Sequence, residues 1–136
     1  MFRGAWRAQR RCIVPASSFF EWRKSDKQPF AIAMGNKGPM AFAGLWDAWS
    51  VENKTPLRSC TIITCGPNAL LEPIHDRMPV ILDPADHARW LDPATTLPGE
   101  ARALLRSYPA DRMTAFPVTT AVNNPAFDDP LCLAPA

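Results

Sequence analysis

Residues 74–82 of the chain read IHDRMPVIL, and the prediction of the fold starts from this stretch. Three ionisable side chains, at positions 75–77, directly precede a proline and an apolar, β-branched run that is typical of a buried strand. Because such a triplet is poorly suited to a core, we expect it to line a cleft. There an imidazole can exchange a proton, Asp76 can set its tautomer and Arg77 can hold an anion. The alternative is a surface turn with an ion pair, and the triplet alone does not decide between the two.

A second informative stretch is residues 15–22, which read PASSFFEW. Alternation along a strand over residues 19–23 places Glu21 on one face and its neighbours Phe20 and Trp22 on the other. Apolar surroundings disfavour the charged form of a carboxylate, so the pKa of Glu21 would rise, which suits acid–base catalysis. A glutamate on an edge strand that points into water is the alternative.

Size and composition indicate one globular domain. The 136 residues, 15.1 kDa, are 47% hydrophobic and 21% charged, which is enough to build one core. No apolar run is long enough to span a bilayer, and the N-terminus lacks the apolar core of a signal peptide, so we expect a cytosolic protein. The four cysteines are spread out without a CxxC pair, and with two histidines they predict reduced thiols and no structural zinc.

Charge is concentrated at the N-terminus. Residues 1–24 carry six basic residues against one acid, a formal +5, whereas the remaining residues carry nine basic and twelve acidic residues, a formal −3. In the predicted helix 2–11, Arg3 and Arg7 recur with Arg10 or Arg11 at helical spacing. This stripe indicates either a surface that faces phosphates or the solvated side of a packed helix.

The pattern of apolar runs and turn residues predicts a β-rich α+β domain over residues 1–136, in which an antiparallel or mixed sheet curls into a barrel with short peripheral helices. Gly44 inside a long apolar strand indicates a bulge or a close backbone approach. Residues 24–27 are a polar hairpin turn, and residues 124–136 an irregular tail. The expected strands are 12–15, 19–23, 29–34, 40–49, 57–64, 78–82 and 113–122, and the expected helices are 2–11, 67–72, 83–91 and 99–107.

Together these stretches resemble the SOS response-associated peptidase (SRAP) family, whose members process abasic sites in single-stranded DNA. The resemblance implies a compact, β-rich α+β domain around a barrel-like core. The matching blocks follow the family's order over residues 1 to about 123: FRGAWR (2–7), RCIVPASSFFEW (11–22), QPF (28–30), FAGLW (42–46), CTIIT (60–64), IHDRMPVIL (74–82), WL (90–91), PVT (117–119) and VN (122–123).

The resemblance also implies a catalytic site. Glu21 matches the family's catalytic glutamate and His75 its catalytic histidine, while Thr64 matches a threonine that lines the same site. Asp76, beside the histidine, is expected to line it too. No cofactor and no metal is expected.

Contacts with single-stranded DNA are implied as well. Trp22 and Arg77 match residues that touch the DNA backbone and bases, and the basic N-terminal stretch is expected to add Arg3, Arg7 and Arg11, since backbone neutralisation and base stacking need arginines and aromatic rings.

The family's chemistry uses an N-terminal cysteine, exposed by removal of the initiator methionine, which attacks the ring-opened aldehyde of an abasic site and closes a stable thiazolidine crosslink. The glutamate would move protons in methionine removal and imine formation, and the histidine would assist ring opening. This chain has Phe2 in place of that cysteine. It resembles the family without about its opening third, so the nucleophile is expected to be missing.

Three interpretations therefore remain. The first is a DNA-directed enzyme of the SRAP type, related to peptidases and DNA lyases, which recognises abasic single-stranded DNA but lacks its nucleophile. The second is a non-catalytic truncated paralogue or fragment that binds DNA or a partner protein. The third is association with itself or with another chain through apolar surface that the missing segment exposes. In the first two, DNA binding would place the protein at the bacterial nucleoid.

Overall fold

Within the residues that the structure describes, the strands form three small sheets, and the chain divides into two compact units. The computed structural model describes residues 2–50, 55–94 and 96–136. We call residues 1–15, 41–65 and 79–108 the Trp90 unit, and residues 16–40, 66–78 and 109–136 the Glu21 unit. Each unit is assembled from three chain segments, and the chain passes from one unit to the other five times.

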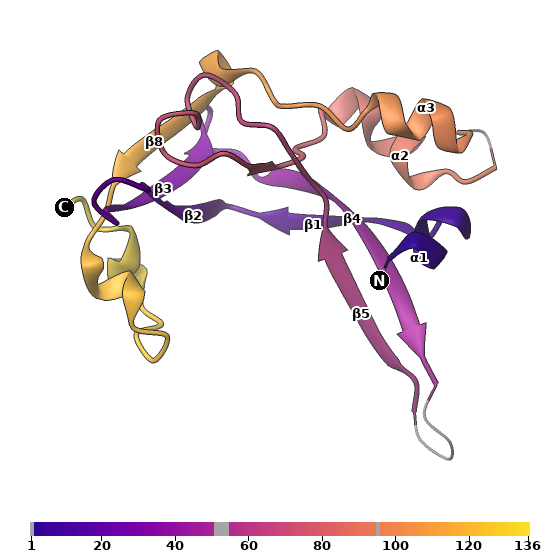
Figure 1. The fold of residues 1–136 in the computed structure, drawn as a ribbon, viewed down its shortest axis with the longest axis horizontal. Coiled ribbons are helices and arrows are strands. Elements are labelled where there is room, and N and C mark those ends of the chain that lie inside the picture. The colour runs from indigo at the N-terminus through magenta and orange to yellow at the C-terminus, as the bar shows by residue number, and fades with distance from the viewer. Residues whose placement is uncertain (1, 51–54, 95) are drawn as a thin grey trace. The chain divides into compact units, whose positions relative to one another are not determined.

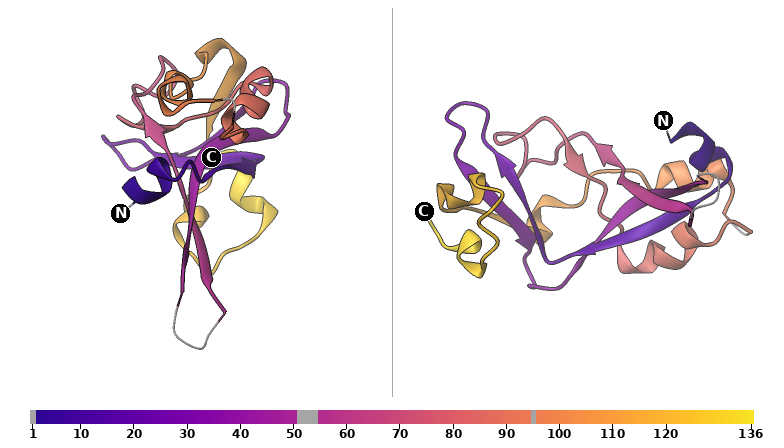
Figure 2. Two further views of the ribbon diagram at one scale, coloured as in Figure 1. Left: turned by 90° about the vertical axis from the view of Figure 1, so that its right-hand side faces the viewer. Right: turned by 90° about the horizontal axis from the view of Figure 1, so that it is seen from below.

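The Trp90 unit contains one three-stranded sheet in the order β1-β4-β5. Strands β4 and β5 pair antiparallel and run side by side (Figures 1 and 2). At Gly44 a Cβ atom would lie 2.9 Å from the Sγ of Cys12 and 3.0 Å from the carbonyl oxygen of Thr61, which confirms the predicted close approach. The elements are α1 (Arg3–Arg7), β1 (Arg11–Ala16), β4 (Met40–Trp49), β5 (Leu57–Ile62), the short 3-10 helix η1 (Pro84–Asp86), α2 (His87–Leu91) and α3 (Pro98–Ala103).

The core of this unit surrounds Trp90. The indole is fully buried, and its Nε1–H donates a hydrogen bond to the carbonyl oxygen of Cys12 at 2.8 Å. Apolar side chains from β4, from the segment before η1 and from α3 fill the space around it, so helices and sheet share one packed interior. Its buried members are Ala41, Ala43, Val80, Leu82, Trp90, Ala101 and Leu104.

The run VIL at residues 80–82 is buried as predicted, but the expected strand 78–82 is reduced to β7 (Met78–Pro79). The backbone N–H of Val80 donates to Ile63, whereas that of Leu82 donates to Ala41. The segment thus bonds first to Ile63 and then to β4, where Ile81 forms an isolated antiparallel bridge to Phe42, and it forms no continuous ladder.

Arg11 corrects two predictions. The helix ends at Arg7 because Gln9 adopts a positive φ of 54°, so Arg11 opens strand β1 and does not continue a helical stripe. Arg11 is only 7% exposed. Its guanidinium donates hydrogen bonds to the carbonyl oxygens of Trp90, Asp92 and Thr96, and it lies 5.7 Å from the centre of the Trp90 ring. It cross-links the unit internally, and we leave it out of the DNA contacts.

The Glu21 unit contains the second three-stranded sheet, antiparallel throughout, in the order β2-β3-β8. The predicted polar turn between β2 and β3 is confirmed, and an ion pair of 2.5 Å between Arg23 and Asp26 closes it. The tail is largely irregular, as expected, and bridges back through Val118 and Pro135. The elements are β2 (Ser18–Trp22), β3 (Pro29–Met34), β8 (Met113–Pro117) and the 3-10 helices η2 (Ala110–Arg112), η3 (Thr120–Asn123) and η4 (Pro130–Leu133); β6 (Thr64–Cys65) and β7 lie next to unit boundaries.

The α+β prediction is confirmed at the level of a strand-rich fold with short helices, and strands 29–34 and 40–49 have the predicted bounds. The predicted barrel is not found: within the described residues no sheet has more than three strands and none closes on itself.

Residues 67–72 form a turn and not a helix. That the chain is one domain stays a prediction. In the described part of the chain, every helix is too short to cross a bilayer.

We expect Arg11→Met to destabilise the protein by about 3 kcal/mol, because it leaves three buried carbonyl oxygens without their donor. The measurement is urea unfolding followed by circular dichroism. Arg10→Met is the matched control: Arg10 forms an ion pair with Asp47 in which both side chains are 40% exposed, so its loss should cost about 0.5 kcal/mol. Equal effects of the two substitutions would contradict the structural role of Arg11.

Candidate active site

Strand β2 positions Glu21. In the antiparallel ladder Glu21 lies opposite Phe30, and the guanidinium of Arg23 lies 5.1 Å from the centre of the same Phe30 ring. The Glu21 side chain is only 24% exposed. Burial raises the pKa of its carboxyl group, and this outweighs the lowering effect of the nearby His75 imidazole and of a backbone hydrogen bond. The carboxyl group is therefore tuned to hold a proton more readily than an exposed glutamate.

A compact turn places His75. The Asn68 side chain accepts hydrogen bonds from the backbone N–H groups of Leu70 and Leu71, which fixes the start of the turn. Leu71 and Ile74 are buried and anchor it, and the backbone N–H of His75 donates to the carbonyl oxygen of Leu71 at 2.8 Å. The imidazole is thus held on a short, braced segment directly after a buried residue.

Lys24 joins the two parts of the site. Its backbone N–H donates to the carbonyl oxygen of Ile74 at 3.3 Å, and its Nζ donates to Oδ2 of Asp76 at 2.6 Å. The hydrogen bond from Lys24 lowers the pKa of Asp76, so Asp76 stays ionised. The end of β2 is therefore tied to the residues on both sides of His75.

These contacts bring the two predicted catalytic groups together. Nδ1 of His75 lies 3.9 Å from Oε1 of Glu21 and 3.4 Å from Oδ1 of Asp76. The same nitrogen lies 3.1 Å from both the backbone N and the carbonyl oxygen of Arg77. The neutral imidazole can accept the Arg77 N–H through Nδ1 and carry its proton on Nε2. The protonated imidazole can instead donate from Nδ1 to the carbonyl or to a carboxylate.

Trp22 flanks Glu21 on the opposite face of β2. Its indole Nε1–H donates a hydrogen bond to Oδ1 of Asn123, at the end of η3, at 2.6 Å. The side chain stays 37% exposed, so the ring is fixed in orientation while part of it faces solvent. Such a ring can stack on an unpaired base.

The structure brings together Glu21, Trp22, His75, Asp76 and Arg77, all in the Glu21 unit. The other predicted site residues belong to the Trp90 unit. Thr64 is exposed in β6, so its place beside Glu21 stays a prediction. Arg3 and Arg7 are exposed on α1, and Arg11 is the buried residue described above.

Two residues of the site were missed by sequence reasoning. Lys24 was assigned to a polar turn, although its position two residues after Trp22 could have drawn attention to it. Asn123 stood in the matching block VN without a role. Each acts through a partner 50 or more positions away in sequence, so no local pattern gives its role.

The pKa of Glu21 predicts how the unfolding free energy of Glu21→Gln depends on pH. Because the carboxyl pKa is higher in the folded chain than its ordinary value of 4.5, the protonated side chain favours folding. That contribution is fully present below about pH 4.5 and is lost as the pH rises through the folded-state pKa. The Glu21→Gln variant does not titrate at this position and has no such loss. Its unfolding free energy relative to that of the wild type should therefore increase between pH 4 and pH 7.

Chemical unfolding at pH 4, 5.5 and 7 measures this difference. Glu72→Gln is the control, because Glu72 is an exposed carboxylate of the same unit and its replacement should stay within about 0.5 kcal/mol at each pH. A constant difference for Glu21→Gln across the range would contradict a raised pKa.

Comparison with known proteins identifies a family to which this chain is similar. The sequence model of the family described as SOS response associated peptidase (SRAP) matches residues 1–125. Abasic site processing protein YoqW of Bacillus subtilis is 45% identical over 124 residues, covering 89% of this chain and 55% of YoqW. Abasic site processing protein HMCES of Xenopus tropicalis is 35% identical over 146 residues, covering 92% of this chain and 43% of HMCES.

A crystal structure of a Bacteroides thetaiotaomicron protein is similar in fold, with a TM-score of 0.84 and 28% identity over 93% of this chain and 57% of that one. The chain thus spans about half the length of the curated relatives that it matches. The match extends over nearly all of the residues from which both units are built, including every residue of the Glu21–His75 site. On this evidence the chain belongs to the SOS response associated peptidase family.

Proposed function

We propose that this chain provides the acid–base part of a centre that processes abasic sites in single-stranded DNA. The single observation that supports this most is the 3.9 Å approach of the Glu21 carboxylate and the His75 imidazole within one unit. The two relatives named above, described as abasic site processing proteins, support the choice of substrate.

In this proposal Glu21 and His75 divide the proton transfers. The partly buried carboxyl group, with its raised pKa, donates a proton to the leaving water when an amine condenses with the sugar aldehyde. The neutral imidazole accepts the proton of the anomeric hydroxyl as the bond to the ring oxygen breaks and returns a proton to that oxygen, while Asp76 stabilises the imidazolium formed in between. Removal of the initiator methionine is the peptidase activity of the family, and Glu21 would also transfer a proton in that reaction.

The proposal assigns the proton transfers to Glu21 and His75 and does not assign the nucleophile. An aminothiol from elsewhere would form the crosslink in two steps. Its amine condenses with the aldehyde and releases water, and its thiol then adds to the imine carbon while the thiol proton passes to nitrogen. Both steps need the proton transfers assigned to Glu21 and His75.

DNA contacts come from exposed residues of both units. Trp22 presents an oriented ring for stacking on a base, and Arg77 stands beside His75. Arg3 and Arg7 supply positive charge on α1, and Thr64 keeps the site-lining role that the family resemblance implies. These contacts need no covalent step.

Binding to single-stranded DNA should be sensitive to salt and should leave no permanent adduct. We expect Arg77→Ala to weaken binding of a 20-mer with one abasic site about fivefold and to reduce the salt slope by about one charge. Trp22→Ala should weaken it about tenfold, as the loss of one stacking contact does. Fluorescence anisotropy at several salt concentrations measures both.

Matched controls are Lys37→Ala, an exposed turn lysine of the same unit, and Trp49→Ala, a 69% exposed tryptophan outside the site. Neither should change the affinity by more than about twofold. Intact-mass spectrometry after denaturation should find unmodified protein. A denaturation-resistant complex would show that a side chain of residues 1–136 acts as a nucleophile and would contradict purely non-covalent binding, and equal effects of the control substitutions would contradict the assigned contacts.

The acid–base roles can be tested by supplying free cysteine as the aminothiol. We expect the chain to accelerate thiazolidine formation between free cysteine and the abasic oligonucleotide, measured by mass spectrometry of the DNA. Glu21→Gln and His75→Gln should each lower the acceleration by about tenfold or more while leaving the DNA affinity within about twofold. Binding without any acceleration by the wild-type chain would support the alternative function, a non-catalytic DNA-binding fragment.

A further inference from the structure

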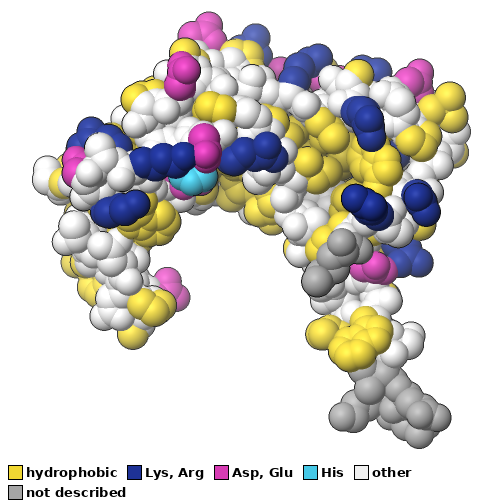
Figure 3. Space-filling view, viewed as in Figure 1, with side chains coloured by type: hydrophobic (Ala, Val, Ile, Leu, Met, Phe, Trp, Pro, Cys, Tyr) yellow, Lys and Arg dark blue, Asp and Glu magenta, His cyan; other side chains and the backbone are white. Residues whose placement is uncertain are grey.

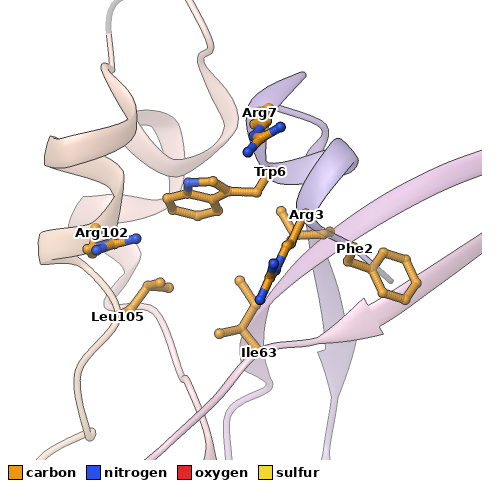
Figure 4. A pocket seen from close by; sticks show the side chains of 8 residues that line it. Phe2, Arg3, Trp6, Arg7, Ile63, Arg102 and Leu105 are labelled. Carbon is orange, nitrogen blue, oxygen red and sulfur yellow. The ribbon is translucent and has the colours of Figure 1, made fainter.

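The Trp90 unit contains a cavity of about 580 Å³ that the proposed reaction does not use. It lies between α1, the residue that follows β5, and α3 with the segment after it. Figure 4 shows Arg3, Trp6, Ile63, Arg102 and Leu105 converging on one open space from these elements. In the space-filling view, hydrophobic side chains and Lys or Arg side chains gather over the region of α1 and α3 (Figure 3).

Three arginines stand around this cavity, and among the described residues no acidic side chain lines it. Arg3, Arg7 and Arg102 are exposed, and no ion pair holds any of them among the residues that the structure describes. Three other arginines of the Trp90 unit do form ion pairs: Arg10 pairs with Asp47, and Arg89 and Arg106 pair with Asp86. Three uncompensated guanidinium groups around one apolar hollow are suited to a ligand with several negative charges.

The interior of the cavity is apolar and rigid. The ring centre of Trp6 lies 6.3 Å from that of the buried Trp90, at an interplanar angle of 42°, so one side of the indole is supported by the core. Ile63, Leu105 and Trp6 are only partly buried and pack against that core. A flat, apolar group can therefore lie against a ring that is already fixed, which reduces the entropic cost of binding.

We propose that this cavity binds a nucleotide of single-stranded DNA, with the base against Trp6 and the flanking phosphates on Arg3, Arg7 and Arg102. The inference rests on the proposed function, and it adds Trp6 and Arg102 to the DNA-contacting residues. A nucleic acid offers what the cavity lacks, a flat apolar group between successive phosphates. A fatty acid carries a single negative charge, which is too few for three arginines. An acidic peptide carries several negative charges, but it need not contain a flat ring that could lie against Trp6.

Photocrosslinking tests the proposal directly. The probe is an undamaged dT20 oligonucleotide carrying one 5-iododeoxyuridine, which crosslinks to nearby aromatic side chains on irradiation, and the products are mapped by peptide mass spectrometry. We expect a crosslink in the peptide that contains Trp6. Crosslinks confined to the Trp22 peptide would overturn the cavity assignment while leaving the proposed function intact, whereas no binding of any oligonucleotide would refute both.

Anisotropy with fluorescein-labelled dT20 provides the second measurement. Arg102→Ala should weaken binding about fivefold at 50 mM salt and reduce the salt slope by about one. Arg106→Ala is the matched control, since Arg106 pairs with Asp86 at 3.5 Å and does not line the cavity, and its affinity should stay unchanged. An equal loss in both variants would overturn the proposal, because it would show a diffuse charge effect.

Competition identifies other occupants. Thymidine 5′-monophosphate at millimolar concentration should reduce the Trp6 crosslink. Displacement of the oligonucleotide from Trp6 by dodecanoate or polyglutamate, but not by the nucleotide, would overturn the assignment to DNA in favour of a lipid or a peptide. Self-association in analytical ultracentrifugation that is abolished by Arg102→Ala would overturn it in favour of a second copy of the chain.

Discussion

The approach of His75 to Glu21 depends on Lys24. The backbone of this residue holds the carbonyl of Ile74, and its ammonium group holds the carboxylate of Asp76, so the histidine lies between two fixed points. The side chains of Lys24 and Asp76 are 58% and 66% exposed, and an exposed ion pair contributes little to overall stability. The ion pair matters for the geometry of the site, because the loop is fixed at Ile74 and at Asp76. The His75 side chain between these two points therefore has few alternative positions.

The ion pair between Lys24 and Asp76 also gives the two carboxyl groups near His75, those of Asp76 and Glu21, different electrostatic roles. Asp76 lies nearer to Nδ1 of His75 than Glu21 does, but it already accepts a hydrogen bond from Lys24. Glu21 is less exposed, so burial keeps its proton affinity high while Asp76 stays ionised. The pKa values of two carboxyl groups that approach the same imidazole nitrogen are thus shifted in opposite directions, an arrangement suited to acid–base catalysis.

Sequence patterns predicted well what depends on neighbours along the chain. The strands Pro29–Met34 and Met40–Trp49, the polar turn before Gln28 and the close approach at Gly44 all follow from local composition. What failed depends on distant partners. The stripe that included Arg11 was predicted by helical spacing, yet the helix had already ended, and the guanidinium bonds to carbonyl groups about 80 residues away.

The same distinction holds for the site. Glu21 and His75 were singled out from the residues around them, and the family resemblance paired them, but sequence alone gave no distance between them. The barrel was inferred from the number and spacing of strands, which do not reveal that residues 80–82 would bond to Ile63 and Ala41 in turn and form only an isolated bridge with β4. The composition of a segment shows which residues are apolar, but it does not show which edge of a sheet they pair with.

The alternation of the chain between its two units constrains how it can be divided. Since each unit draws on three separated segments, no single cut releases either one as a continuous polypeptide. Many native contacts join residues distant in sequence, so loop closure must precede most of the packing and assembly should be slow for a chain of this length. A nascent chain cannot complete the Glu21 unit until its last residues have left the ribosome.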